Sequence, residues 1–78
     1  MAYRAWVFTL NNPTRECVEY AEALAAHERV QYYVFQKEVG ENGTPHLQGY
    51  LFMEKRMRLR VLRGLFEPES PHWEPPRS

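Results

Sequence analysis

The sequence predicts a single α+β domain in which helices cover one face of an antiparallel sheet. Several segments are rich in β-branched and aromatic residues and end at clusters of Gly, Pro or Asn, as strands do. Two other segments repeat their apolar residues at helical spacing. Along the chain, the order is strand, helix, strand, strand, helix and a short final strand candidate.

The first strand is expected at residues 5–10, AWVFTL, which stop at the breaker cluster NNP. An apolar stripe after Pro13 predicts the first helix, which should fade near residues 27–29. Asn12 or Thr14 would cap this helix, and Pro13 suits its first turn. The residues of the stripe are Cys17, Val18, Ala21, Leu24 and Ala25.

The second and third strands should form a hairpin. Residues 30–39, VQYYVFQKEV, and 46–53, HLQGYLFM, flank the turn cluster GENG at 40–43. A second helix is expected at 56–66. Its inward residues would be Met57, Val61, Leu62 and Leu65. In the proline-rich tail only SPHWE, at 70–74, suits a short edge strand. The order β-α-β-β-α-β is that of a ferredoxin-like fold with helices on one face.

Length and composition limit the class of protein. Seventy-eight residues suffice for one domain, which would bury only about 60% of its unfolded surface. Cys17 is the single cysteine, so an internal disulfide is excluded and a reducing compartment fits best. No apolar run approaches the roughly 20 residues of a membrane span. We therefore expect a soluble, intracellular protein without a membrane partner.

The charge is balanced overall but uneven along the chain. Lys and Arg together number 10, as do Asp and Glu. A dedicated duplex DNA binder usually carries a basic excess, which this chain lacks. Residues 55–63, KRMRLRVLR, nevertheless hold five basic residues and no acid. A polyanion would therefore bind to this local basic segment rather than to the protein as a whole.

Polar residues alternate along the strand expected at 46–53. His46, Gln48 and Tyr50 would share one face. If the turn centres near Asn42, Glu38 lies opposite His46, with Cβ atoms about 4.5–5.5 Å apart. A carboxylate, an imidazole and an amide then converge, a set that suits Mg²⁺ or Mn²⁺ with waters completing six-fold coordination. On spacing alone, three solvated polar residues remain the more common reading of this pattern.

Two motifs resemble those of a known family. FTLNNP, at 8–13, and PHLQGYL, at 45–51, with KEVGENGT between them, resemble motifs I and II of the replication initiator (Rep) proteins of small circular single-stranded DNA viruses, especially the circovirus group. The resemblance covers essentially the whole chain, in order. It implies a His-hydrophobic-His endonuclease in which Gln replaces the second His.

The resemblance also implies roles for individual residues. Glu38, His46 and Gln48 would be the ligands of Mn²⁺ or Mg²⁺. A second group would shape and recognise the DNA site: Phe8, Thr9, Leu10, Asn11, Asn12 and Pro13. The implied partner is single-stranded DNA at a replication-origin hairpin, and the implied compartment is the host nucleus.

In the family so implied, a metal polarises the scissile phosphate and a tyrosine of a third motif, Tyr-x-x-Lys, attacks it. The products are a 5′-phosphotyrosine link and a 3′-hydroxyl that primes rolling-circle synthesis. Here no tyrosine has Lys three positions on; Tyr33 comes nearest, with Gln36 at that place. We therefore expect residues 1–78 to be a single partial endonuclease domain that lacks the nucleophile and does not cleave DNA.

Other readings remain open. Arg56, Arg60 and Arg63 would lie within about 60° on a helical wheel. A solvated face is the default for such a row, and phosphate contact is the alternative that the resemblance favours. His72 could lie beside the metal site if its strand neighbours the first. Trp6, Phe8, Tyr33 and Phe35 are expected to be core or sheet-face residues.

Two rival functions remain as well. One is a metal-independent module that binds single-stranded nucleic acid on a ferredoxin-like sheet, with aromatic side chains as stacking platforms. The other is an interaction fragment that self-associates through an exposed sheet edge.

Overall fold

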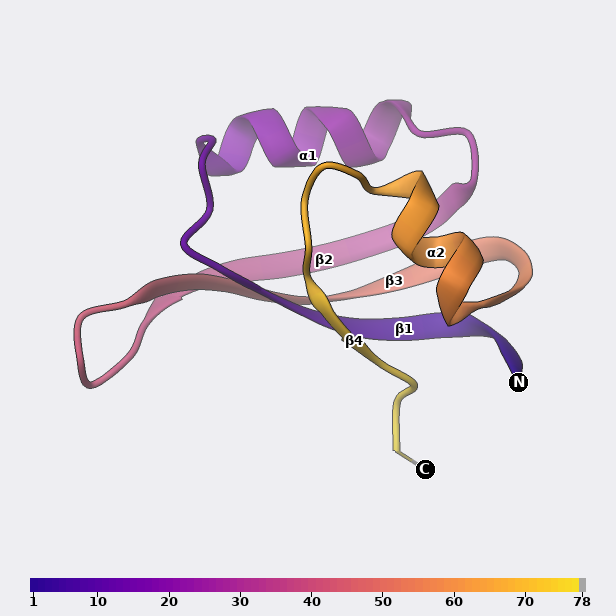
Figure 1. Cartoon of the computed structure of the whole chain (residues 1–78). Helices are drawn as coiled ribbons and strands as arrows, with labels where there is room; N and C mark the ends of the chain where they lie inside the picture. The colour runs from indigo at the N-terminus through magenta and orange to yellow at the C-terminus, as the bar shows by residue number, and fades with distance from the viewer. Residues whose placement is uncertain (78) are drawn as a thin grey trace.

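The computed structural model describes residues 1–77 as a four-stranded antiparallel sheet with two helices on one face (Figure 1). The predicted α+β class and order of elements are confirmed. Among the described residues, neither helix has the length and apolar character needed to span a bilayer. The elements are β1 (Ala2–Asn11), α1 (Cys17–Ala26), β2 (Val30–Val39), β3 (Pro45–Arg58), α2 (Leu59–Leu65) and β4 (His72–Glu74).

The strands lie in the order β2-β3-β1-β4. The short strand predicted in the tail is therefore present, at the edge beside β1. The long strand β3 pairs with β2 on one side and β1 on the other. Because β1 and β3 occupy the centre, they decide which side chains face the helices and which face the opposite, uncovered side. We call that uncovered side the open face.

Both central strands are longer than the sequence predicted. Ala2 pairs with Arg58 and Tyr3 with Met57, after a register shift that leaves extra residues on β3. The helix predicted at 56–66 is therefore wrong at its start, because residues 56–58 belong to β3. The physical reason is burial: Met57 is 5% exposed and lies in the core, so pairing with β1 extends the strand through it.

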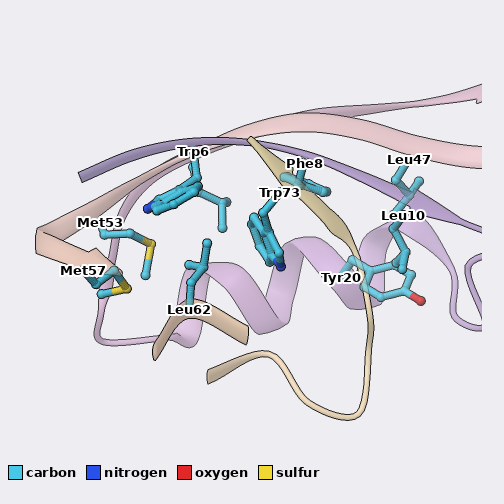
Figure 2. Close-up of a cluster of buried hydrophobic side chains, with 10 residues drawn as sticks. Trp6, Phe8, Leu10, Tyr20, Leu47, Met53, Met57, Leu62 and Trp73 are labelled. Atoms are coloured by element: carbon cyan, nitrogen blue, oxygen red, sulfur yellow. The ribbon is translucent and has the colours of Figure 1, made fainter. Parts of the chain in front are cut away.

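The core fills the layer between the sheet and the helices (Figure 2). Alternation along the strands points every second side chain into this layer. Each of these buried residues is at most 7% exposed, and each large apolar one contributes about 1.5–3 kcal/mol through burial. The core residues are Trp6, Phe8, Leu10, Tyr20, Leu47, Leu51, Met53, Met57, Leu62 and Trp73.

The helices bury faces that differ from those predicted. In α1 the buried residue is Tyr20, with Cys17 and Leu24 packed against the core, whereas Val18 is 62% exposed. The spacing of 17, 20 and 24 defines one helical face, and it was missed because tyrosine interrupts a purely aliphatic stripe. In α2, Val61 was expected to face inward, yet it is 48% exposed.

The start of α1 also differs in its cap. Glu16 and Glu19 form a capping box, in which the Glu19 carboxylate accepts the Glu16 backbone N–H at 3.2 Å. The predicted caps, Asn12 and Thr14, lie before this position. Asn12 instead has a positive φ of 52° and donates its backbone N–H to the carbonyl of Pro45 at 2.9 Å. That bond fixes the end of β1 against the start of β3.

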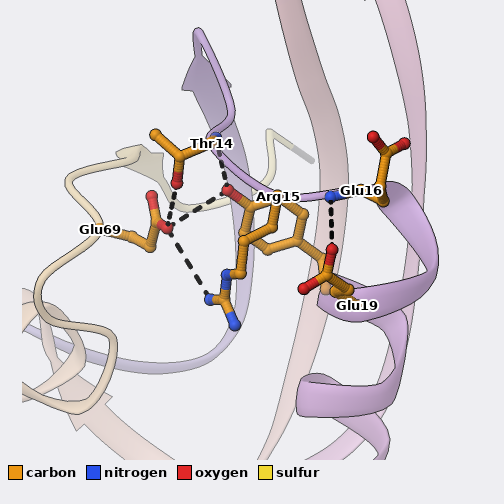
Figure 3. A network of polar contacts seen from close by, with 6 residues as sticks. Thr14, Arg15, Glu16, Glu19 and Glu69 are labelled. Atoms are coloured by element: carbon orange, nitrogen blue, oxygen red, sulfur yellow. Dashed lines mark hydrogen bonds and ion pairs between the residues drawn. The ribbon is translucent and has the colours of Figure 1, made fainter.

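One carboxylate ties the start of α1 to the loop before β4 (Figure 3). Glu69 Oε1 accepts hydrogen bonds from Thr14 Oγ1 at 3.4 Å and from the Tyr20 hydroxyl at 3.2 Å. Arg15 Nη2 lies 3.8 Å from the same oxygen, and the Tyr20 hydroxyl accepts the Thr14 backbone N–H at 3.0 Å. We call these four residues the Glu69 cluster. It holds the loop against the first turn of the helix.

Gly49 in β3 faces the core rather than forming a bulge. A Cβ built there would lie 2.5 Å from Phe35 Cβ and 2.8 Å from Phe8 Cε1, and against the carbonyl oxygen of Val34. The register is regular through this position on both sides. A glycine at this position therefore lets Phe8 of β1 and Phe35 of β2 pack directly against the backbone of β3.

Candidate functional site at the hairpin end of the open face

The hairpin end of the open face gathers polar side chains from three strands. The predicted register is observed, with Glu38 directly opposite His46. On its other side His46 lies opposite Asn11 of β1. Neighbouring strands lie about 4.7–4.9 Å apart, so these three residues form one short row across β2, β3 and β1.

A second row lies one step along the strands. Gln48 of β3 lies opposite Gln36 on β2 and Thr9 on β1. Thr9 in turn lies opposite His72 of β4. His72 was expected to lie near the metal site if its strand neighboured the first. Its strand, β4, does pair with β1, and His72 lies in the same row as Gln48, two strands away.

Glu38 and His46 are in direct contact. His46 Nε2 lies 3.1 Å from Glu38 Oε1, and Gln36 Nε2 donates a hydrogen bond to Glu38 Oε2. The bond from Gln36, followed by that from His46, stabilises the carboxylate and lowers the pKa of Glu38 below 4.5. Glu38 is therefore ionised near neutral pH and has both oxygens oriented. The sequence analysis did not include Gln36 in the site, although a residue two positions before Glu38 in a strand lies on the same face.

The donor set fits a hard divalent cation. It supplies a carboxylate oxygen, an imidazole nitrogen and an amide oxygen. Glu38 Oε1 and His46 Nε2 contact each other directly at 3.1 Å, so an ion held by both would take the place of that contact. Within residues 1–77 no three His, Cys, Asp or Glu side chains cluster, so a third ligand would come from Gln48 or from water.

Motif I divides between the two faces of the sheet. Phe8 and Leu10 are 6% and 7% exposed and lie in the core, so their side chains shape the site from beneath. Thr9 and Asn11 lie on the open face, beside Gln48 and His46. Asn12 and Pro13 follow the strand. Sequence reasoning treated these residues as one DNA-recognition group, whereas the structure leaves only Thr9 and Asn11 beside the polar rows.

The three arginines do not form the single helical row that was predicted. Arg56 belongs to β3, near the end far from the hairpin, whereas Arg60 and Arg63 lie on α2. All three are exposed. Because α2 packs on the covered face through Leu62, its arginines and the rows around Gln48 lie on opposite sides of the sheet.

Aromatic side chains continue the open face beyond the polar rows. Tyr50 is the next residue of β3 on this face, and its ring lies 6.3 Å from that of Tyr32, which is 56% exposed. One step further, the guanidinium of Arg4 lies 4.4 Å from the centre of the Phe52 ring. Polar and aromatic groups thus follow one another along β3.

Comparison with known proteins identifies the family. Residues 3–78 match the family model described as "Putative viral replication protein". The chain belongs to this family. The resemblance seen in the motifs is thereby confirmed.

Relatives at 40–45% identity come from circoviruses and from plant viruses. The chain is 43% identical over 76 residues to the replication-associated protein of Pigeon circovirus, covering 97% of this chain and 23% of that protein. It is 45% identical over 62 residues to that of Beak and feather disease virus, covering 80% and 21%. The master replication protein of Banana bunchy top virus matches at 41% over 61 residues, covering 78% and 19%. The chain thus spans about a fifth of these relatives.

Proposed function

We propose that this chain is the metal-dependent DNA nicking and joining domain of a rolling-circle replication initiator, without the nucleophilic tyrosine. The observation that carries the proposal is the Glu38–His46 contact, beside Gln48 on the open face. The family relation supports it, since the relatives are replication proteins of viruses. The order β2-β3-β1-β4, antiparallel throughout, supports a ferredoxin-like arrangement as part of the same proposal.

Each residue of the site would have its own task. Glu38, His46 and Gln48 would hold Mn²⁺ or Mg²⁺, and Gln36 would orient Glu38 through its hydrogen bond. When bound, the ion supplies polarisation of a phosphate oxygen. Thr9 and Asn11, whose positions adjoin Gln48 and His46, would contact the DNA strand next to the site.

Further parts of the proposal concern partners and location. We propose single-stranded DNA at a replication-origin hairpin as the partner and the host nucleus as the compartment. Exposed Arg56, Arg60 and Arg63 would contact phosphates, the first along β3 and the other two from α2. Self-association would use the outer edge of β2, a ten-residue strand that among residues 1–77 pairs with β3 alone.

A second candidate function is metal-independent binding of single-stranded nucleic acid. The observation that favours it is the pair of Tyr32 and Tyr50 rings on the open face. An exposed aromatic platform can contribute about 1–3 kcal/mol per stacked base. In this alternative, Glu38 and His46 would be a solvated pair without a ligand.

Metal dependence of DNA binding separates the two functions. We would measure the affinity for a labelled single-stranded oligonucleotide by fluorescence anisotropy, with Mn²⁺ and with a chelator. The proposed function requires tighter binding with Mn²⁺, and His46→Ala should remove that gain. His27→Ala, which changes a histidine on the covered side of the sheet, is the matched control and should retain it. Equal affinity with and without Mn²⁺ would favour the second function.

A further inference from the structure

The end of the open face that lies away from the hairpin carries a group of side chains that the proposed function does not use. The pairing of β3 is irregular on both sides at this level, between residues 3 and 5 of β1 and between residues 30 and 32 of β2. The residues at these irregularities are Arg4 and Gln31. Irregular pairing re-aims side chains and is common beside functional sites. Here it lets Arg4 and Gln31 meet, although β3 separates their strands.

The guanidinium of Arg4 is held by three contacts. It lies over the Phe52 ring, 4.4 Å from the ring centre. Its Nε donates a hydrogen bond to the Met53 carbonyl at 3.2 Å, and its Nη2 donates one to Gln31 Oε1 at 2.8 Å. The five N–H donors of arginine lie in one plane, so these two bonds fix that plane. The side chain is therefore an ordered, flat cation that loses little rotamer freedom when a ligand binds.

The outer side of this group reaches solvent. Arg4 and Phe52 are half-buried, whereas Gln31 is exposed, so the Nη2 bond lies at the surface. Nη1 takes part in neither of the two hydrogen bonds. Because the Phe52 ring occupies one face of the guanidinium, a planar ligand would stack on the opposite face.

The position of Arg4 continues the aromatic row of the open face. Phe52 follows Tyr50 by two residues, so the two side chains share a face and lie about 6–7 Å apart along β3. Tyr32 lies directly opposite Phe52, and its ring contacts that of Tyr50 edge-on. Bases of a single strand stack on aromatic rings and on guanidinium planes. Phe52 lies about 13 Å beyond Gln48, which places the group a few nucleotides from the proposed metal site.

We propose that Arg4 and Phe52 form a subsite for one base of a bound single strand, and that this base stacks on the guanidinium of Arg4. Gln31 keeps the guanidinium in its plane and is a positioning residue. The attraction between the cation and the π face of the base adds to the contact between the two flat surfaces. The inference rests on the DNA-binding part of the proposed function and is independent of the metal.

The test compares two strands that differ only in their bases. One is a hexamer of deoxyadenosine, and the other is a hexamer of abasic sugars with the same number of phosphates. Both are titrated in a chelator while ¹H–¹⁵N NMR follows the Arg4 Nε–H signal, which the bond to Met53 protects from exchange and which Arg4→Lys assigns. The adenosine strand should move this signal upfield through the ring current of the stacked base. The abasic strand should leave it in place.

Two variants separate stacking from an effect on stability. Arg4→Lys keeps the charge but offers no plane to a base. It should weaken binding of the adenosine strand by about 5-fold or more and that of the abasic strand by less than about 2-fold. Lost stability would instead weaken both strands equally. Arg15→Lys is the matched control and should change neither affinity, because Arg15 also lies over a ring, that of Tyr20 at 4.6 Å, but on the covered side of the sheet.

The outcomes distinguish this subsite from the proposed function. The subsite is overturned if the Arg4 signal stays in place while fluorescence anisotropy shows that the adenosine strand binds, and the proposed function then stands. It is also overturned if both strands move the signal equally, since that would indicate a phosphate contact. A base-dependent shift in chelator, together with an affinity that Mn²⁺ leaves unchanged, would support the subsite and contradict the metal-dependent function.

Discussion

The carboxylate of Glu38 and the imidazole of His46 face each other across the β2–β3 hairpin, with Oε1 3.1 Å from Nε2. The two residues stand on either side of a short turn, and the register of the hairpin sets them directly opposite each other. Gln36 holds the second oxygen of the same carboxylate. The pair is therefore preorganised before any ligand arrives, and this arrangement leads to several measurable consequences.

Metal binding should raise the melting temperature. A ligand that binds only the folded state stabilises it by about 2.7 kcal/mol at 100 times its Kd. For a domain of this size that corresponds to about 10–20 °C. Titration with Mn²⁺, followed by circular dichroism, should show this rise in the parent but not in His46→Ala. If His46→Ala responds as the parent does, the ion binds elsewhere.

Acid should weaken the fold partly through Glu38. Its folded pKa lies below the 4.5 of the free side chain, chiefly because Gln36 donates a hydrogen bond to the carboxylate. A depressed pKa contributes stability above the unfolded pKa, and that stability is lost as the pH falls through the folded pKa. We compare the two proteins in buffer that contains a chelator. Between about pH 5 and pH 3, the free energy of unfolding should fall further for the parent than for Glu38→Gln. Urea titrations at each pH measure this, and equal losses would contradict it.

DNA binding should depend on salt through the arginines. Each phosphate contact on a single strand adds about 0.7 to the slope of log affinity against log salt. Replacing Arg56, Arg60 and Arg63 by Gln should reduce that slope by about 2, and Arg56→Gln alone by about a third of this. Arg77→Gln, an exposed change in the tail, is the matched control. A slope that the triple variant leaves unchanged would assign the arginines to a solvated surface.

The 78-residue chain should not nick a single-stranded origin sequence, even with saturating Mn²⁺. Transesterification needs an oxygen nucleophile held in line with its leaving group. Tyr50 is the tyrosine that follows Gln48 on the open face, and it lies about 6–7 Å further along the strand. Its ring is also engaged edge-on with Tyr32. A denaturing gel should show no covalent protein–DNA adduct. An adduct that disappears in Tyr50→Phe would make Tyr50 the nucleophile.

Gly49→Ala should destabilise the domain. The added methyl group would overlap Phe35, Phe8 and the Val34 backbone, and such overpacking typically costs about 1–3 kcal/mol. Gly64→Ala is the matched control, because nothing lies within 4 Å of a Cβ at that position in α2. It should be neutral or stabilise by up to about 1 kcal/mol. Urea denaturation compares the two variants, and equal midpoints would contradict the packing argument.

Much of the fold followed from local patterns. Alternation and turn residues placed β2, β3 and the hairpin register, because the GENG turn allows little freedom in pairing. The end of β3 was mispredicted, since a run of basic residues with apolar ones at helical spacing also fits a strand end, residues 54–58, in which Met57 alone is buried. Tyr20 was missed because a tyrosine interrupts the aliphatic stripe, and Glu69, which accepts the hydrogen bond of its hydroxyl, lies far away in the chain.

The candidate site was predictable to a similar extent. Strand alternation placed Glu38, His46 and Gln48 on one face, and the same rule would have added Gln36. The split of the arginines between β3 and α2 could not be read from spacing, because it depends on where the strand stops.

The strand order has a consequence for how the chain acquires its structure. β1 is made first, yet Val7 pairs with Tyr50 of β3 and with Glu74 of β4. The apolar side chains of β1 therefore have no sheet to join while the chain emerges from the ribosome. The β2–β3 hairpin is the local pair and can form within microseconds, whereas β1 must insert beside it at a cost in loop closure. We expect the domain to assemble from its middle outward, with β1 exposed to chaperones until β3 has emerged to pair with it.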